Sequence, residues 1–282
     1  MHTDREIRGI RTAVAGWRGR GEYIGLVPTM GNLHDGHLRL VEAARRSADR
    51  VVVSLFVNPL QFAPGEDYER YPRTFEADAA RLAEAGVDLL FAPDVATLYP
   101  DGGSRPPTRV EVPGLSDILC GAGRPGHFTG VATVVTKLFN IVAPDAAWFG
   151  EKDYQQLLVI RRLVADLCLP VEVFGVPTVR ESDGLALSSR NGYLTPEQRA
   201  AAPALYQALT AARDAVLAGE EPGNASAAGR HLLEEAGFEP EYFTIRRAAD
   251  LDEPGPEDRD LVALAAARLG EARLIDNVRF ER

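Results

Sequence analysis

Apolar runs alternate with amphipathic stretches along the N-terminal part of the chain. The runs have the length and composition of buried strands, and they cover residues 23–27, 50–57, 87–92, 146–149 and 171–176. Stretches with helical spacing lie between most of them, over residues 38–48, 74–85, 128–142 and 154–167. A further, opening helix is predicted where Ile7, Ile10, Val14 and Trp17 recur. This alternation predicts a parallel sheet with helices on both faces.

The pattern changes after Pro177. Residues 180–191 are polar and resemble a loop, and Thr195 is a plausible N-cap for an alanine-rich helix. Short strands are predicted at residues 242–246, 261–266 and 273–276. We therefore expect an α/β protein with a Rossmann-like, doubly wound parallel sheet over residues 1–178. A second, smaller α+β domain would cover residues 179–282.

Composition and charge narrow the classes of partner. The formal net charge of −10 argues against a broad nucleic-acid binder, which needs a surplus of Lys and Arg. Residues 1–21 contain no apolar signal core, and no run of about eighteen apolar residues occurs, so neither secretion nor membrane spanning is expected. The expectation is a cytoplasmic protein. Cys120 and Cys168 lie far apart without metal-type spacing, which argues against a zinc site or a disulfide framework.

Residues 28–37, with the sequence PTMGNLHDGH, contain the strongest candidate chemistry. They lie between the strand predicted at 23–27 and the helix at 38–48, so His34 and His37 fall in the loop and the first helical turn. Three residues apart, the two side chains can face the same way. A helix N-terminus offers unpaired N–H groups and a positive dipole end, and two imidazoles add donors. This predicts a phosphate-binding loop, and the alternative is two ordinary loop histidines beside a glycine turn.

Further polar residues follow the other predicted strands. Ligands of such sheets bind beyond the carboxyl ends of the strands, where His34, Asn58, Gln61 and Lys152 would lie. On the residues alone, Gln61 could equally be a solvent-facing loop residue and Lys152 a surface lysine.

Three other positions also have ordinary structural interpretations. Gln156 could be a solvent-facing residue at a helix start, and residues 188–190 could form a polar hinge loop. We expect His127, which follows Gly126, to cap a helix or to lie in the core rather than to act in catalysis.

Seven stretches together resemble one family, the pantothenate synthetases or pantoate–β-alanine ligases, which belong to the nucleotidyltransferase superfamily with a HIGH-type motif. The matching stretches are residues 28–37, 57–62, 124–128, 149–156, 177–181, 184–191 and 273–277. Each is weak alone, but their order and spacing are specific, and the resemblance covers nearly the whole chain. One departure is Cys120, where similar proteins usually carry an acidic residue before the glycine, which concerns only details of that loop.

The resemblance implies a two-step ligation. The carboxylate of (R)-pantoate attacks the α-phosphorus of ATP to give pantoyl adenylate and pyrophosphate, and β-alanine then displaces AMP to give pantothenate. Such chemistry depends on positioning and charge stabilisation rather than on a nucleophilic side chain. The resemblance also implies a homodimer, with nucleotide and pantoate binding in residues 1–178 and a lid or dimer-associated role for residues 179–282.

The resemblance assigns site residues as well. His34, His37 and Lys152 would be catalytic, Gln61 would bind pantoate and β-alanine, and Gln156 would bind pantoate. The residues implied to bind ATP are Met30, Gly31, Asn32, Leu33, His34, Asp35, Gly36, His37, Gly150, Glu151, Lys152, Asp153, Val179, Leu187, Ser188, Ser189 and Arg190. Mg2+ would arrive with ATP, because the sequence shows no dedicated carboxylate cage, and Asp78 is left unassigned as a metal ligand.

Two rival functions remain open at this point. Another nucleotidylyltransferase would share the HIGH-type loop, and a non-catalytic nucleotide-binding module would keep the fold without turnover. Gln61, Gln156 and the stretch 188–191 argue against the first of these, and an assay for AMP separates all three.

Overall fold

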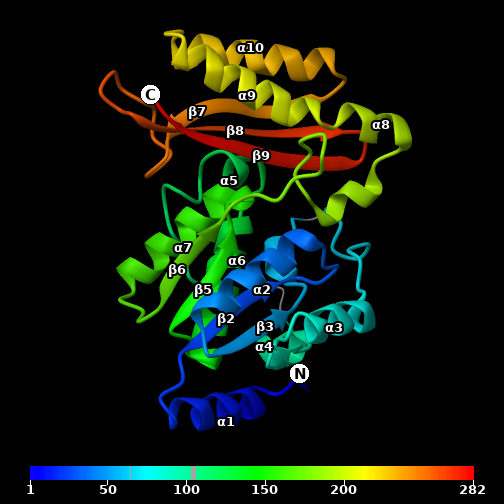
Figure 1. Ribbon diagram of the computed structural model, residues 1–282, viewed down its shortest axis with the longest axis vertical. Coiled ribbons are helices and arrows are strands. Elements are labelled where there is room, and N and C mark those ends of the chain that lie inside the picture. The colour runs from blue at the N-terminus through cyan, green and yellow to red at the C-terminus, as the bar shows by residue number, and fades with distance from the viewer. Residues whose placement is uncertain (64, 103–105) are drawn as a thin grey trace. The chain divides into compact units, whose positions relative to one another are not determined.

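The computed structural model describes residues 1–63, 65–102 and 106–282, which form two compact units (Figure 1). Unit 1 comprises Met1–Glu151 and Val159–Pro177, and unit 2 comprises Lys152–Leu158 and Thr178–Arg282. The short segment Lys152–Leu158 therefore groups with the C-terminal residues, although the residues just before it in the chain belong to unit 1.

A six-stranded parallel sheet forms the centre of unit 1, in the order β1-β4-β3-β2-β5-β6. Its strands are β1 (His2–Asp4), β2 (Ile24–Thr29), β3 (Arg50–Leu55), β4 (Leu89–Phe91), β5 (Ala146–Gly150) and β6 (Glu172–Val176). The predicted Rossmann-like α/β fold is confirmed. The edge strand β1 was not predicted, because its three residues are polar and largely exposed and carry no apolar run.

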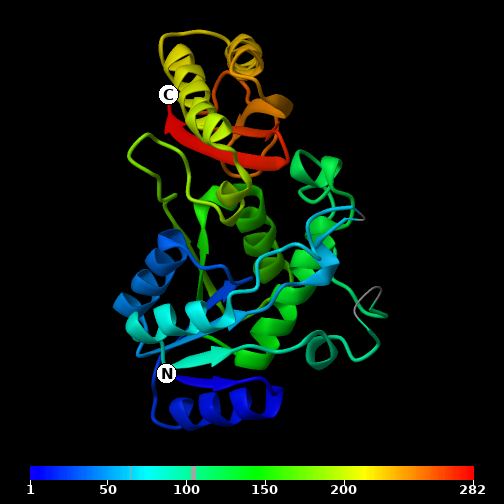
Figure 2. The ribbon, with the colours of Figure 1, turned by 90° about the vertical axis from the view of Figure 1, so that its right-hand side faces the viewer.

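Helices cover both faces of this sheet, which makes it doubly wound (Figure 2). Helices α2 (Asp35–Ser47) and α3 (Phe75–Glu84) pack on one face, where Val41 and Leu82 join Val27, Val53 and Leu90 in a single core. Helices α1 (Ile7–Arg18) and α6 (His127–Val142) contact each other and β2. The remaining helical segments before unit 2 are η1 (Pro59–Gln61), α4 (Val95–Leu98), α5 (Cys120–Gly123), η2 (Glu151–Asp153) and α7 (Tyr154–Asp166).

The strand order reverses between β2 and β5, and their pairing ends early at that point. β2 pairs with β5 only at Gly25 and Leu26, whereas its pairing with β3 continues to Thr29. Pro28 lies in the part of β2 that has no β5 partner, where its missing N–H costs no hydrogen bond to that strand. Open α/β sheets bind ligands beyond the carboxyl ends of the strands at such a reversal.

Unit 2 contains the smaller α+β domain that the sequence predicted. Its antiparallel sheet has the order β7-β8-β9, with β7 (Glu239–Arg247), β8 (Asp260–Leu269) and β9 (Ala272–Glu281). Its helical segments are η3 (Ser189–Tyr193), α8 (Pro196–Ala201), α9 (Ala204–Leu217) and α10 (Pro222–Glu235). α9 and α10 pack on this sheet, and Leu209, Leu233 and Leu274 lie in their shared core (Figure 1).

Thr195 caps α8, as predicted, through a reciprocal pair of hydrogen bonds with Gln198: the Gln198 N–H donates to Thr195 Oγ1 at 3.3 Å, and Gln198 Oε1 accepts the Thr195 N–H at 3.0 Å. Within the described ranges, no helix combines the length and apolar character needed to cross a membrane.

Candidate active site

The loop between β2 and α2 turns sharply at two left-handed residues. Gly31 has φ 85° and Asn32 has φ 50°. A Cβ atom at Gly31 would lie 3.1 Å from Asp78 Oδ2 and 3.2 Å from Leu55 Cδ2, so both the conformation and the close approach favour glycine. The turn leads directly to His34, the residue before the first turn of α2.

Asp78 of α3 holds this loop in place. Its carboxylate is 2% exposed and accepts the backbone N–H groups of Asn32 at 2.9 Å and Leu33 at 2.8 Å, as well as the Thr74 hydroxyl at 3.0 Å. Arg81, one turn further along α3, donates to the Leu33 carbonyl. The sequence assigns Asp78 no metal, and its oxygens are engaged by these donors, so we assign it to loop positioning.

The imidazole rings of His34 and His37 both accept a backbone hydrogen bond at the start of α2, each through its own Nδ1 atom. His34 Nδ1 accepts the Gly36 N–H at 3.2 Å, and His37 Nδ1 accepts the His34 N–H at 3.3 Å. A nitrogen that accepts a hydrogen bond carries no proton, so this pattern assigns both rings to the neutral tautomer with hydrogen on Nε2. The ring centroids are 4.1 Å apart, which makes the two imidazoles a paired donor group at a helix N-terminus.

The side-chain amide of Gln61 is oriented by its neighbours. Asn58 Nδ2 donates to Gln61 Oε1 at 3.1 Å, and Gln61 Nε2 donates to Met30 Sδ at 3.1 Å. Asn58 is oriented in turn by the buried Tyr99 hydroxyl, which donates to Asn58 Oδ1 at 3.0 Å. The Gln61 oxygen is thus engaged within the protein, while its NH2 group faces a thioether, which is a weak acceptor.

His127 neither caps a helix nor lies in the core, so both structural expectations for it were wrong. Gly126 is the N-cap of α6, and His127 is half-buried at the first helical position. Its Nδ1 lies 2.8 Å from the Gln61 carbonyl oxygen, and Arg124 donates to the same oxygen at 3.1 Å. The reason is tertiary: the start of α6 packs against η1, which carries Gln61.

Unit 2 presents a compact polar loop before η3. The Leu187 N–H donates to the Val179 carbonyl at 2.9 Å, and a turn at Gly184, with φ 95°, closes the loop between them. Ser188 caps η3, since its Oγ accepts the Arg190 N–H at 3.2 Å. Four of the predicted ATP residues therefore take part in local hydrogen bonds, Val179 with Leu187 and Ser188 with Arg190.

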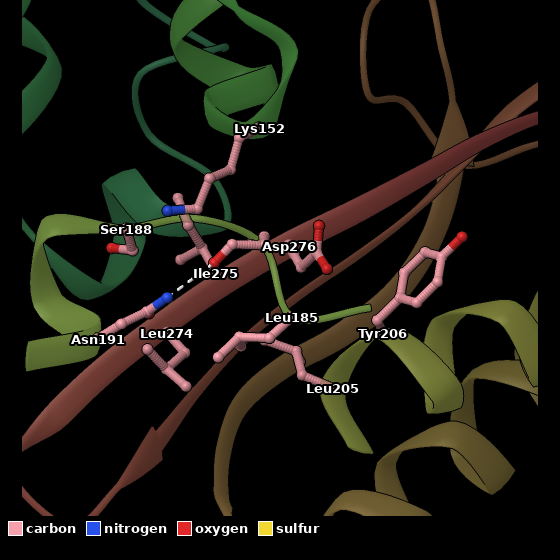
Figure 3. Close-up of a pocket in the computed structure, with 10 residues that line it drawn as sticks. Lys152, Leu185, Ser188, Asn191, Leu205, Tyr206, Leu274, Ile275 and Asp276 are labelled. Atoms are coloured by element: carbon pink, nitrogen blue, oxygen red, sulfur yellow. Dashed lines mark hydrogen bonds between the residues drawn. The ribbon is translucent and has the colours of Figure 1, made fainter. Parts of the chain in front are cut away.

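A small pocket in unit 2 contains the side chain of Lys152 (Figure 3). The residues lining it are Lys152, Leu185, Ala186, Ser188, Asn191, Leu205, Tyr206, Leu274, Ile275 and Asp276. Burial lowers the pKa of the Lys152 ammonium, Asp153 and Asp276 oppose that change, and Arg190 and Arg180 lower the pKa further. In Figure 3 the Lys152 side chain extends toward the part of the pocket that contains Ser188.

Arg180 forms an ion pair with Asp276, which lines the pocket that contains Lys152. Arg180 binds both carboxylate oxygens, with Nη2 2.9 Å from Oδ1 and Nη1 closer still to Oδ2, and its guanidinium lies 3.8 Å from the centroid of the Tyr206 ring. Asp276 is 3% exposed. Burial raises the pKa of Asp276, and the hydrogen bonds from Arg180 and from the Asn277 N–H oppose that shift because they favour the ionised form.

The predicted site residues therefore form two groups, one in each unit. In unit 1, residues 30–37 form one loop, and Met30 contacts Gln61. In unit 2, Lys152 and Ser188 line one pocket, and Gln156 is half-buried on the first turn of α7. Among the described residues, no group of three or more His, Cys, Asp or Glu side chains could hold a metal ion.

The supporting roles of Asp78 and Asp276 could not be inferred from the sequence. Asp78 is four residues after Thr74, and this helical spacing is a signal that could have paired them, but nothing in the sequence connects either to residues 32–33. Asp276 lies in the matched stretch 273–277, yet its partner Arg180 is 96 residues away. The resemblance of residues 273–277 to the family therefore marked Asp276 as part of a motif, but it did not indicate that Asp276 pairs with Arg180.

The sheet order and the histidine pair at the first turn of α2 define a class, the Rossmann-like α/β proteins with a HIGH-type loop. The model of the pantoate-β-alanine ligase family matches residues 2–279. A pantothenate synthetase of Shewanella sp. (strain MR-7) is 56% identical over 282 residues, covering 100% of both chains. The chain belongs to the pantoate-β-alanine ligase family, which confirms the resemblance found in its motifs.

Solved structures agree with this family and with the fold. A pantothenate synthetase from Thermus thermophilus is 54% identical and superimposes with a TM-score of 0.92 over 99% of both chains. A pantoate-β-alanine ligase from Francisella tularensis, solved in complex with β-γ ATP and β-alanine, is 34% identical with a TM-score of 0.83, covering 99% of this chain and 97% of its own. The predicted ligase class is confirmed.

Proposed function

We propose that this chain condenses (R)-pantoate with β-alanine to give pantothenate, AMP and pyrophosphate through a pantoyl adenylate. The observation that carries the proposal is the His34–His37 pair at the start of α2, in a chain that matches the pantoate-β-alanine ligase family from residue 2 to residue 279. The Francisella relative of known structure binds an ATP form and β-alanine, which supports the same substrates here.

In unit 1, the loop from Met30 to His37 binds the phosphates of ATP. Its helix N-terminus supplies backbone N–H donors and a positive dipole end, and His34 and His37 supply Nε2–H donors. Both imidazoles are neutral in this assignment, so they act as hydrogen-bond donors on the developing charge rather than as acids. The residues assigned to ATP in this loop are Met30, Gly31, Asn32, Leu33, His34, Asp35, Gly36 and His37.

In unit 2 and the adjoining end of β5, a second set of residues binds ATP. Lys152 supplies the ammonium that stabilises the departing pyrophosphate, and Ser188 and Arg190 supply further donors to the phosphates. Val179 and Leu187, which are joined by a backbone hydrogen bond, contact the nucleotide. The full set of residues assigned here is Gly150, Glu151, Lys152, Asp153, Val179, Leu187, Ser188, Ser189 and Arg190.

Gln61 binds pantoate and β-alanine, and Gln156 binds pantoate. Because Gln61 Oε1 accepts from Asn58, the Gln61 NH2 group is the part of the amide that a substrate meets, so it donates to a hydroxyl or carboxylate oxygen. Such an oxygen is a stronger acceptor than the Met30 thioether and displaces it. A neutral amide holds the pantoate carboxylate without the charge neutralisation that would reduce its nucleophilicity.

Two steps make up the reaction. A pantoate carboxylate oxygen attacks the α-phosphorus in line as the bond to the β-phosphate oxygen breaks, and pyrophosphate leaves with its electron pair. The amine of β-alanine then attacks the acyl carbon, AMP leaves, and the amine nitrogen gives up its proton. Positioning and charge stabilisation account for such phosphoryl chemistry, and the residues assigned above supply both.

Several finer assignments belong to the same proposal. Mg2+ arrives with ATP, whose phosphate oxygens supply most of its ligands, because the Asp78 carboxylate is engaged by loop donors. Residues 1–178 bind nucleotide and pantoate, and residues 179–282 act as a lid or in dimer contacts.

The active form is a homodimer in the cytoplasm without nucleic-acid or membrane partners. Light scattering during size-exclusion chromatography tests the dimer, and a single-chain mass would refute it.

One isotope experiment separates this function from its rivals. With oxygen-18 in the pantoate carboxylate, label should appear in AMP, because that oxygen forms the bond to the α-phosphorus. Label in inorganic phosphate would point to an acyl phosphate and would overturn the adenylate route. Another nucleotidylyltransferase would give no pantoate-dependent AMP, and a non-catalytic module would bind ATP without any turnover.

A further inference from the structure

The last strand of the chain, β9, contacts Lys152 through its backbone and its pocket. Asn277, which is 7% exposed, donates from Nδ2 to the Lys152 carbonyl oxygen at 2.9 Å. Its neighbour Asp276 lines the pocket that contains the Lys152 side chain (Figure 3). Two consecutive residues of β9 therefore contact this region, because Asn277 holds the main chain of Lys152 and Asp276 contributes a carboxylate to the lining of its pocket.

Charged groups from several elements act electrostatically on this ammonium. They are Asp153 of η2, Arg180 of the loop before η3, Arg190 of η3 and Asp276 of β9, and the phenol of Tyr206 on α9 also lines the pocket. Three of the groups gathered here, Lys152 included, are cations. Cations in a poorly hydrated site repel one another strongly, so their coexistence needs local neutralisation.

Asp276 neutralises Arg180 and also holds it in place. Arg180 binds both carboxylate oxygens, and it donates to the carbonyl oxygens of Gly184 at 3.1 Å and Asn277 at 3.2 Å. With these donors engaged and its plane lying over Tyr206, the guanidinium is fixed as a structural group. The Lys152 ammonium is instead a compact charge on a flexible stem, and its charge state responds to burial and to neighbouring charges.

We infer that Asp276 is a positioning residue for Lys152: by neutralising Arg180, its carboxylate allows the Lys152 ammonium in the same pocket as Asp276 to stay charged for the ATP phosphates. This inference rests on the proposed assignment of Lys152 to ATP. It adds that the charge of Lys152 depends on a residue that does not touch the substrate, located 124 positions later in the chain. Loss of the Asp276 charge leaves Arg180 as an unneutralised cation, which favours the uncharged amine at Lys152.

The chain offers a direct way to measure the charge of Lys152. Lys137 and Lys152 are its only two lysines. Protein labelled with 13C at lysine Cε should therefore give two side-chain resonances whose pH titrations can be followed separately. Lys137 belongs to unit 1 and lies 5.2 Å from the Tyr99 ring centroid, so it serves as an internal reference. A Lys152→Arg variant assigns the two signals.

In Asp276→Asn, the Lys152 resonance should titrate at lower pH than in the unmodified protein, and the Lys137 resonance should not move. The double variant Arg180→Gln with Asp276→Asn should return the Lys152 midpoint toward its original value, because the unneutralised cation is gone. The matched control is Glu241→Gln, which breaks a carboxylate–arginine pair to Arg273 in the same sheet, at 2.9 Å. An unchanged Lys152 midpoint in Asp276→Asn, or an unrestored one in the double variant, overturns the inference.

Kinetic measurements test whether adenylation depends on Asp276 through the charge of Lys152. Pantoate-dependent exchange of pyrophosphate into ATP reports the first step alone. Asp276→Asn should lower its rate about tenfold at alkaline pH and less at neutral pH, since a weakened phosphate donor costs less than a deleted one. Lys152→Ala combined with Asp276→Asn should be no slower than Lys152→Ala alone. If Lys152→Ala leaves exchange intact, the proposed role of Lys152 in ATP binding fails, while the titration still decides the role of Asp276.

Discussion

His37 Nδ1 accepts the backbone N–H of His34 at 3.3 Å, so one imidazole of the pair is anchored by the main chain of the other. His34 Nδ1 in turn accepts the Gly36 N–H. Each ring therefore has two roles. Its Nδ1 atom accepts a backbone N–H at the start of α2, and its Nε2 atom carries the hydrogen that we assign to ATP. Their structural and catalytic roles can be separated by substitutions that replace one nitrogen at a time.

His37→Ala should lower kcat by ~10²-fold or more and should raise the KM for ATP much less, because donors of this kind act mainly on developing charge. His37→Asn keeps an acceptor near Nδ1 and should preserve the turn but not the activity. His37→Gln keeps a donor near Nε2 and should retain more activity than His37→Asn. Steady-state kinetics on the three variants provides the comparison, and an unchanged kcat in His37→Ala would remove His37 from the catalytic residues.

Asp78→Asn should weaken ATP binding and also destabilise the protein. One carboxylate oxygen that accepts a backbone N–H becomes an NH2 group, which cannot accept, so a charge-assisted hydrogen bond worth about 2 kcal/mol is lost. The loop that holds His34 then relaxes, and the KM for ATP should rise while that for pantoate changes little. Urea unfolding and kinetics measure the two effects.

The control for Asp78 is Asp94→Ala, which removes the N-cap hydrogen bond to Thr97 at the start of α4. Loss of such a cap destabilises the start of the helix. It should leave the KM for ATP unchanged. Equal kinetic effects in both variants would mean that Asp78 acts only through general stability.

Gln61→Ala and Gln156→Ala should each raise the KM for pantoate far more than the KM for ATP. Each amide is assigned to the acid, and Gln61 Nε2 is the donor that its neighbours leave facing a weak acceptor. Calorimetric titration with ATP should show near-normal binding in both variants. A parallel loss of ATP affinity would contradict the assignment of these residues to pantoate.

The sequence predicted most of the unit 1 sheet because buried parallel strands are continuous apolar runs. It placed the start of the helix after β2 at Leu38, whereas α2 begins at Asp35. The earlier start depends on imidazole nitrogens that accept backbone N–H groups, and the apolar pattern does not encode them. The strands of unit 2 are longer than predicted. In β8 the local sequence is a weak guide, because alanine does not favour a strand in isolation.

The supporting contacts of the site were harder to predict than its motif residues. Residues 28–37 and 184–191 indicated their chemistry because glycine, histidine and serine occur there in characteristic order. The bond from the Leu33 N–H to Asp78 connects residues 45 apart, and the pair of Arg180 with Asp276 connects residues 96 apart. Only the packing of α3 and β9 shows that the Leu33 N–H donates to Asp78 and that Arg180 pairs with Asp276. The error at His127 has the same origin, because its partner is the carbonyl group of Gln61.

The half-reactions should depend differently on Lys152. Negative charge accumulates on the leaving pyrophosphate only during adenylation, so a nearby ammonium assists that step and matters little for aminolysis. Lys152→Ala should nearly abolish the formation of pantoyl adenylate. Supplied with purified pantoyl adenylate and β-alanine, the same variant should keep a substantial share of the original rate of pantothenate production. Lys137→Ala is the matched control, and it should retain both half-reactions.

The pH dependence of adenylation should report the same ammonium. Burial lowers the pKa of Lys152, so the charged form is present below that pKa and is lost as the pH rises through it. Adenylation in the unmodified protein should therefore decline at a lower pH than an ordinary lysine would give, and aminolysis of supplied adenylate should not share that decline. Equal losses in both half-reactions, with the fold intact by circular dichroism, would show that Lys152 organises the whole site rather than the first step.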